Sequence, residues 1–249
     1  MDELSAALHE HTWFGLDLDD TLHEFRKASK AAAAKVFHHI SRKSQIPVNE
    51  LAISYSEILT QKTATAFTDG RKSKYYRKER FGALLEKRDL QFDENYLILL
   101  AALYKDALES ALELKAGTLS LLRYLRYIGK RVVVVTEGPQ DAQKWTIEKL
   151  GLSEYLDELV TTNKFGKSKT DGLFESVLEY LGIEGKHMVY IGDNYARDII
   201  PACEQGIMTV HLDEVEDVVL SQGGMRICSL LTIETILRLR EPETKGPSA

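Results

Sequence analysis

Two kinds of hydrophobic pattern divide this chain near residue 116. Between residues 23 and 115, apolar residues recur at helical spacing, and Ala, Leu, Lys and Glu are frequent. This stretch is therefore predicted to be entirely helical. Breaks are expected at Pro47 and at the turn sequence 68–70. The expected helices span residues 28–40, 50–62, 74–87 and 93–112.

The rest of the chain alternates short apolar runs with helical stretches, which predicts a parallel sheet covered by helices on both faces. The expected strands are residues 13–18, 131–136, 159–162, 187–191, 206–212 and 226–228. The expected helices are residues 119–128, 139–150, 171–181, 196–203 and 232–240.

The fold class that this pattern predicts is a doubly wound, Rossmann-like α/β sheet with a helical domain inserted after its first strand. The core is expected to comprise residues 12–22 and 116–240, and the inserted helical domain residues 23–115. Residues 241–249 include two prolines and a glycine, so a flexible tail is expected there.

Composition narrows the class of protein only moderately. The 249 residues, 44% of them hydrophobic, suffice for one large domain or a core with a lid. A net charge of −6 argues against a nucleic-acid binder that acts through overall charge. Two cysteines, Cys203 and Cys228, exclude a disulfide-rich scaffold and a four-cysteine zinc site. No apolar run has membrane-spanning length and no secretion signal is visible, so a cytoplasmic protein without a membrane partner is expected.

Polar residues follow the expected strands where the strands end, and the carboxyl ends of parallel strands meet at one edge of the sheet. Asp17, Asp19 and Asp193 would bring a charge of −3 to that edge. Two unit charges about 4 Å apart repel by about 4 kcal/mol at an effective dielectric of 20. A divalent cation and one lysine, either Lys167 or Lys169, would offset this charge, and oxygen ligands favour Mg²⁺. Such a pocket can accept a phosphate dianion, which a carboxylate can attack.

These segments resemble the motifs of the haloacid dehalogenase-like (HAD) hydrolase superfamily. The sequence Asp-Leu-Asp-Asp-Thr-Leu at 17–22 resembles the first motif and Thr136 the second. Lys169 resembles the third motif, and Gly-Asp at 192–193 with Asp198 the fourth. Order and spacing agree over roughly residues 12–240, and the helical insertion resembles the C1-type cap. Each residue alone also fits a simple structural role, such as a turn or a helix N-cap; their joint placement indicates a site.

The resemblance implies a mechanism and its residues. Asp17 would be the nucleophile that forms an aspartyl-phosphate, and Asp19 the general acid and base. The presence of Asp19 favours phosphate-ester chemistry over carbon–halogen cleavage. Asp17, Asp193 and the backbone carbonyl of Asp19 would hold Mg²⁺, with Asp198 as a further ligand or an orienting residue. Thr136 would bind the phosphoryl oxygens, and Lys169 would neutralise charge on the nucleophile and phosphate.

The chain departs from the superfamily's pattern in two of these motifs. The second motif usually has Asn after the Ser or Thr, whereas this chain has Glu137 in that phosphate-binding position. A carboxylate there disfavours phosphate binding unless it points away or is paired. The third motif usually reads Lys-Pro, but Lys169 precedes Thr170, which makes Lys167 a rival. Lys169 is preferred because Phe174 then falls where the family's pattern places a Phe.

Residues 71–88 form the strongest charge run, with eight basic and two acidic residues and interleaved aromatic residues. A solvated helix face is the favoured interpretation. Alternatively, the run binds nucleotides or nucleic acid, or one or two of its basic residues face the active site and bind an anionic substrate group.

The function that the sequence favours is an Mg²⁺-dependent phosphatase acting on a small phosphorylated metabolite, with nucleic acid not expected as a partner. Two alternatives stay open. One is a catalytically weak HAD-like protein that binds a partner through the basic helix of the cap. The other is a phosphomutase, which returns the phosphoryl group to a sugar. The sequence identifies neither the substrate nor the oligomeric state.

Overall fold

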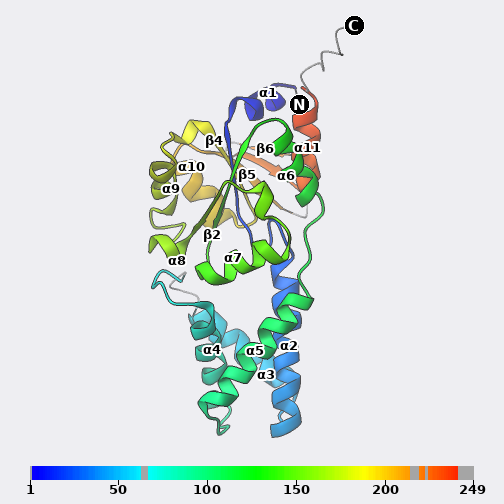
Figure 1. The fold of residues 1–249 in the computed structure, drawn as a ribbon, viewed down its shortest axis with the longest axis vertical. Coiled ribbons are helices and arrows are strands. Elements are labelled where there is room, and N and C mark those ends of the chain that lie inside the picture. The colour runs from blue at the N-terminus through cyan, green and yellow to red at the C-terminus, as the bar shows by residue number, and fades with distance from the viewer. Residues whose placement is uncertain (1, 63–66, 214–218, 222–223, 241–249) are drawn as a thin grey trace.

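The structure is a computed structural model, and it describes residues 2–62, 67–213, 219–221 and 224–240. A core built on a seven-stranded sheet occupies one end of the molecule, and a bundle of helices occupies the other (Figure 1). The strand order is β3-β2-β1-β4-β5-β7-β6. The strands are β1 (Trp13–Leu16), β2 (Arg131–Thr136), β3 (Glu158–Thr161), β4 (Met188–Gly192), β5 (Met208–Leu212), β6 (Val219–Ser221) and β7 (Gly224–Ile227).

The topology is doubly wound, and the predicted fold class is confirmed. The chain runs from β1 outward to β2 and β3 on one side, and then crosses to β4 and β5 on the other. These strands and β7 are parallel, and β6 pairs antiparallel with β7 at the edge. Leu16 is in register with both Val134 and Ile191. The strand order therefore reverses beside β1, and sheets of this kind bind ligands at such a point, beyond the carboxyl ends of the strands.

The valine run of β2 shows how helices cover both faces of the sheet. Val132 and Val134 belong to one buried cluster, and Val133 and Val135 belong to another. Successive side chains of a strand point to opposite faces, so a continuous apolar run requires cover on both sides. The first face packs against α1 (Asp2–Glu10), α6 (Thr118–Tyr127), α7 (Gln140–Lys149) and α11 (Leu230–Arg238), and the second against α9 (Leu173–Leu181) and α10 (Ile200–Glu204).

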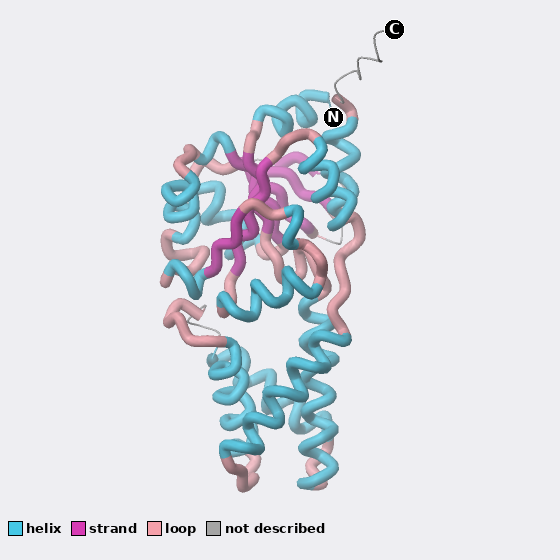
Figure 2. The backbone as a smooth tube through the Cα atoms, in the orientation of Figure 1, coloured by secondary structure: helices cyan, strands magenta, loops and turns pink. Residues whose placement is uncertain are grey.

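Four helices between β1 and β2, hereafter the cap, form a bundle with a buried core of its own (Figure 2). In this core Tyr55 stacks on Phe81 with ring centroids 5.5 Å apart and meets Phe37 edge-on at 5.3 Å. Two neighbouring chain segments join the cap to the sheet, and the N–H of Glu24 donates to the carbonyl of Glu113 across them (2.9 Å). The cap helices are α2 (Phe25–Ser44), α3 (Val48–Lys62), α4 (Ser73–Lys87) and α5 (Glu94–Ser110).

Several elements differ from the sequence prediction. The nine-residue helix α1 was not expected, because so short a helix depends on tertiary packing, here of Leu4 and Leu8. The helix expected at 196–203 begins as a π-helix, Tyr195–Ile199, before α10. Also unexpected are β6, α8 (Thr162–Phe165) and the 3₁₀ turns Ser153–Tyr155 and Gly185–His187.

The expected tail at 241–249 lies outside the described residues. None of the helices that the structure describes is long and apolar enough to cross a membrane.

Candidate active site

The turn after β1 brings a buried carboxylate to the point where the strand order reverses. The N–H of Asp17 donates to the carbonyl of Ile191 in β4 (2.9 Å), which ties the turn to the neighbouring strand. The hydroxyl of Thr21 donates to Oδ2 of Asp17 (3.3 Å). Asp20 adopts a left-handed conformation (φ 63°), and its N–H donates to the carbonyl of His23 (2.9 Å). Because Asp tolerates this conformation better than most residues, the chain can turn back here without glycine.

A lysine bridges two carboxylates at the centre of the site. Nζ of Lys169 lies 2.5 Å from Oδ1 of Asp17 and 2.5 Å from Oδ1 of Asp198, and all three side chains are buried. Burial raises the pKa of Asp17 well above its ordinary value. Burial also acts to lower the pKa of Lys169, but the charges of Asp17 and Asp198 outweigh it and raise that pKa. Nζ of Lys167 lies beside Gly172 instead, so Lys169 is the lysine at the centre.

Three carboxylates form a compact acidic cluster that fits a divalent cation. Asp17, Asp193 and Asp198 each offer one oxygen, and these oxygens lie within 4.8 Å of one another. Burial, followed by the charge of Asp198, raises the pKa of Asp193, although Arg26 donates to it at 2.7 Å and acts in the opposite direction. The positive charges of Lys169 and Arg26 therefore do not fully offset the negative charge of the three carboxylates. Oxygen donors of this kind suit a hard cation such as Mg²⁺ or Ca²⁺.

The end of β4 holds Asp198 in place. Its Oδ1 accepts a hydrogen bond from the hydroxyl of Tyr190 (3.1 Å), and its Oδ2 accepts one from the N–H of Asn194 (3.0 Å). A Cβ atom added at Gly192 would lie 2.5 Å from Cγ of Asp198. The carboxylate can therefore lie against the strand end only because glycine occupies that position.

The carboxylate of Asp19 has two side-chain partners. Its Oδ1 lies 2.9 Å from Nε2 of the buried His23, and its Oδ2 accepts from Nε2 of Gln143 (3.2 Å). The same amide nitrogen lies 3.2 Å from the carbonyl of Glu137 and 3.5 Å from the hydroxyl of Thr136. Gln143 of α7 thus connects the first and second motifs. Sequence reasoning missed it, because no spacing or motif distinguishes it from other polar helix residues.

Glu137 is paired with a positive side chain. Its carboxylate therefore meets the condition under which a negative charge at this position is compatible with phosphate binding. Its carboxylate forms an ion pair with Arg197, and its Oε1 accepts from the backbone N–H of Lys169 (3.2 Å). Arg197 comes from the π-helix Tyr195–Ile199. Glu137 therefore connects the ends of three strands, and Arg197 offsets its negative charge. Sequence reasoning could not identify this partner, since Arg197 is 60 positions away.

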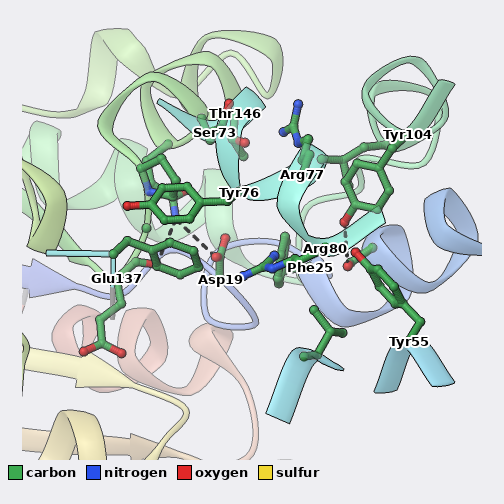
Figure 3. A pocket seen from close by; sticks show the side chains of 18 of the residues that line it. Asp19, Phe25, Tyr55, Ser73, Tyr76, Arg77, Arg80, Tyr104, Glu137 and Thr146 are labelled. Carbon is green, nitrogen blue, oxygen red and sulfur yellow. Dashed lines mark hydrogen bonds between the residues drawn. The ribbon is translucent and has the colours of Figure 1, made fainter. Parts of the chain in front are cut away.

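A cavity of about 380 Å³ lies between this sheet edge and the cap (Figure 3). Asp19 and Glu137 line its core side, and Arg77 and Arg80 of α4 line its cap side. Figure 3 shows the side chain of Arg80 extending in the direction of Asp19. Aromatic rings from the cap also line the cavity, namely Phe25, Tyr55, Phe67, Tyr76 and Tyr104.

The basic run at 71–88 is divided between the cavity and solvent. Arg77 and Arg80 line the cavity, whereas Lys72 and Lys74 are exposed. The alternative that one or two of these basic residues face the site is therefore confirmed as to their position, and the prediction of an entirely solvated face is wrong. Residues 77 and 80 are three positions apart and therefore share one face of α4.

Comparison with known proteins identifies the family. Residues 12–204 match the family model of haloacid dehalogenase-like hydrolases. The chain belongs to this family, as its motifs predicted.

Its relatives include two glyceraldehyde 3-phosphate phosphatases. The one from Methanothermobacter thermautotrophicus is 26% identical over 234 residues, which cover 90% of this chain and 96% of the relative. The one from Methanocaldococcus jannaschii is 31% identical over 96 residues, which cover 38% of this chain and only 42% of that relative.

Solved structures support the same fold. The HAD-hydrolase YfnB from Bacillus subtilis, bound to magnesium, superposes with a TM-score of 0.69 at 23% identity. The match covers 92% of this chain and 99% of YfnB. A HAD phosphatase from Thermococcus onnurineus superposes with a TM-score of 0.67 at 22% identity, over 91% of this chain and 97% of that one.

Proposed function

We propose that this protein is an Mg²⁺-dependent phosphatase that hydrolyses a small phosphomonoester through an aspartyl-phosphate. The observation that carries the proposal is the cluster around Lys169, which lies 2.5 Å from both Asp17 and Asp198. Asp193 completes the cluster, and Asp19 follows two residues after Asp17. This arrangement supplies a nucleophile, a cation site and an acid in one place, where Asp17 and Asp198 are buried and Asp19 and Asp193 are half-buried.

Asp17 is the proposed nucleophile. Lys169 and Thr21 each donate to one oxygen of its carboxylate and hold it in place, and the carboxylate attacks phosphorus in line with the leaving group. The P–O bond to the leaving alcohol breaks as the bond from Asp17 to phosphorus forms. Lys169 also stabilises the negative charge that develops on the phosphoryl oxygens. Thr136, fully buried at the end of β2, is proposed to bind those oxygens through its hydroxyl.

Asp19 is the proposed general acid and base. It donates a proton to the leaving oxygen, and then takes a proton from the water that attacks the aspartyl-phosphate. Its hydrogen bonds to His23 and Gln143 hold the carboxyl in one orientation for both steps. Water attack releases inorganic phosphate and restores the carboxylate of Asp17.

The residues proposed to hold Mg²⁺ are Asp17, Asp193 and the backbone carbonyl of Asp19, with Asp198 as a further ligand or an orienting residue. The ion supplies positive charge that screens the nucleophile from the phosphate dianion. The three carboxylate oxygens within 4.8 Å of one another support this assignment.

We propose different roles for the two parts of the chain, catalysis for the core and substrate selection for the cap. Residues 12–22 and 116–240 form the catalytic core, and residues 23–115 form a C1-type cap that covers the site and selects the substrate. Closure of such a cap excludes water from the reaction. The names of the relatives, glyceraldehyde 3-phosphate phosphatases, support a small phosphorylated substrate.

The ion pair of Glu137 with Arg197 favours a working phosphatase over the catalytically weak alternative. That alternative attributes the loss of turnover to Glu137 or to a closed cap, and the ion pair bears on the first of these.

The test is hydrolysis of 4-nitrophenyl phosphate and a panel of phosphorylated metabolites by the purified chain, with Mg²⁺ and with chelator. We expect turnover only with Mg²⁺, and a loss of at least about a thousandfold in Asp17→Asn, because the nucleophile is removed. Asp171→Asn, which changes an exposed carboxylate outside the cluster, is the matched control. Activity that survives unchanged in Asp17→Asn would overturn the mechanism. Release of inorganic phosphate, rather than a transferred phosphoryl group, separates a phosphatase from a phosphomutase.

A further inference from the structure

The cap side of the cavity carries two arginines about one helical turn apart. Arg77 and Arg80 both belong to α4 and both line the cavity. Residues three positions apart lie on the same face of a helix, and like charges there repel. Burial lowers the pKa of Arg77, and the nearby charge of Asp141 acts in the opposite direction without outweighing it. The positive charge on this wall is therefore not fully offset within the protein.

Arg80 also has hydrogen-bond donors that the protein does not use. Its Nε and Nη2 atoms are buried and have no hydrogen-bond partner among the residues that the structure describes. Its guanidinium lies over the ring of Phe67, 5.3 Å from the centroid. An aromatic ring contacts the face of a guanidinium and leaves the N–H groups at its edge free. Buried charged donors without an acceptor are costly, and a bound anion would remove that cost.

The partners proposed for the phosphate that reacts are separate from these arginines and belong to the core. Thr136 and Lys169 belong to the core, at the carboxyl ends of strands. The surroundings of the two arginines are cap rings, since Arg77 lies 5.4 Å from the ring centroid of Tyr104. On the core side the cavity is lined by Asp19, two residues after Asp17, and on the cap side by the two arginines. The planar guanidinium binds carboxylate and phosphate groups through two parallel hydrogen bonds.

We propose that the leaving alcohol of the substrate carries a second anionic group, a carboxylate or a phosphate, which binds Arg80 and Arg77 across the cavity from Asp19. The proposal rests on the phosphatase function and specifies its substrate class. The aromatic rings that line the cavity suit an apolar, ring-sized scaffold, and a volume of about 380 Å³ is enough to hold one.

The test compares substrates of equal size and different charge. In 4-nitrophenyl phosphate the group opposite the ester is neutral, in 4-carboxyphenyl phosphate it is a carboxylate, and in 1,4-phenylene bisphosphate it is a phosphate. Each is assayed with the wild type, Arg80→Gln and Arg80→Lys. Lys74→Gln removes a positive charge from the same helix outside the cavity and is the control. Taking the variant-to-wild-type ratio of kcat/KM for each substrate cancels the difference in leaving-group reactivity.

We expect Arg80→Gln to lower kcat/KM for the anionic substrates at least about tenfold more than for 4-nitrophenyl phosphate, mainly through KM. Arg80→Lys should recover part of the loss, and Lys74→Gln should leave the ratios unchanged. A larger effect on the bisphosphate identifies phosphate as the second group, and a larger effect on the carboxylate identifies carboxylate.

Equal losses for all three substrates would overturn the proposal and would mean that Arg80 acts on the transferred phosphate. No loss for any of them would also overturn it. If Arg80→Gln does not fold, as judged by circular dichroism, Arg77→Gln carries the same comparison. Absence of Mg²⁺-dependent hydrolysis of every substrate by the wild type would instead contradict the phosphatase function itself.

Discussion

At the scale of single residues, the site depends on side chains that orient the catalytic groups and are not themselves part of the recognised motifs. Gln143 is the clearest case, because one amide nitrogen lies within 3.5 Å of oxygens of Asp19, Thr136 and Glu137. A hydrogen-bond donor of this kind does not react itself but holds a functional carboxylate in its productive orientation.

Replacing Gln143 by Met keeps the volume and removes the donor. We expect kcat to fall about tenfold with little change in KM, because Asp19 loses a partner that orients it while substrate contacts remain. Steady-state kinetics with 4-nitrophenyl phosphate measures both constants. Lys144→Met, at the exposed neighbouring position, is the control. A rise in KM with unchanged kcat would contradict an orienting role.

Replacing Asp193 by Asn should stabilise the metal-free protein while impairing function. Burial and the charge of Asp198 raise the pKa of Asp193, so its ionised form is disfavoured in the fold. Removing that charge should increase the free energy of unfolding at pH 8 by about 1 kcal/mol. A raised carboxyl pKa destabilises the fold in full above the raised pKa and not at all below the ordinary pKa of an unfolded Asp, so the gain should shrink as the pH falls from the first to the second.

Denaturant unfolding at pH 8 and pH 5, with and without Mg²⁺, measures this effect. Mg²⁺ should stabilise the wild type more than Asp193→Asn, since a ligand stabilises only the state that binds it. Equal stabilisation of both proteins by Mg²⁺ would place the cation elsewhere.

At the scale of elements, three strand ends are linked by one side chain. Glu137 follows β2, accepts from the N–H of Lys169 after β3 and pairs with Arg197 after β4. The loops that carry the motifs are therefore connected to one another as well as to the sheet. The π-helix that begins at Tyr195 supplies Arg197, and such helices occur often at functional sites.

Charge balance at Glu137 can be tested with a pair of substitutions. Arg197→Gln leaves a carboxylate unpaired beside the phosphate, so we expect kcat/KM to fall about tenfold. Glu137→Gln combined with Arg197→Gln should recover most of the loss, because both charges are then absent. Kinetics of the two single variants and the double variant provide the test. A double variant no better than Arg197→Gln would mean that Arg197 itself binds the substrate.

At the scale of the whole molecule, function requires the cap and the core to meet over one cavity. Asp141 of α7 accepts from the backbone N–H of Ser73 (2.9 Å) and from its hydroxyl (2.8 Å), at the start of α4. These bonds tie the helix that carries Arg77 and Arg80 to the core.

Replacing Asp141 by Ala should remove these two hydrogen bonds and weaken the attachment of α4 to the core. We expect KM to rise about tenfold, because two hydrogen bonds to a charged acceptor no longer hold the cap wall of the cavity. Kinetics measures KM, and hydrogen exchange should show faster exchange in the first turn of α4. Glu148→Ala, at an exposed position of the same helix, is the control. Unchanged KM and unchanged exchange would show that the tie has no part in substrate binding.

The pattern of apolar and polar residues was sufficient to predict the sheet, the helical insertion and the residues at the strand ends. The run 131–136 was predicted with the same bounds as β2, because both of its faces are buried and its side chains are nearly all β-branched. The carboxyl ends of parallel strands share one edge of the sheet for any conformation of the loops. The sequence was therefore sufficient to predict that four residues lie near one another: Asp17, Thr136, Lys169 and Asp193.

The partners of those residues depend on how distant parts of the folded chain pack together. The pairing of Glu137 with Arg197, the contact of Gln143 with Asp19 and the placement of Arg80 in the cavity join positions remote in the chain. No periodicity encodes such contacts, because a polar side chain on a helix has the same local pattern whether it faces solvent or a cavity. The packing of the cap against the core settles that choice.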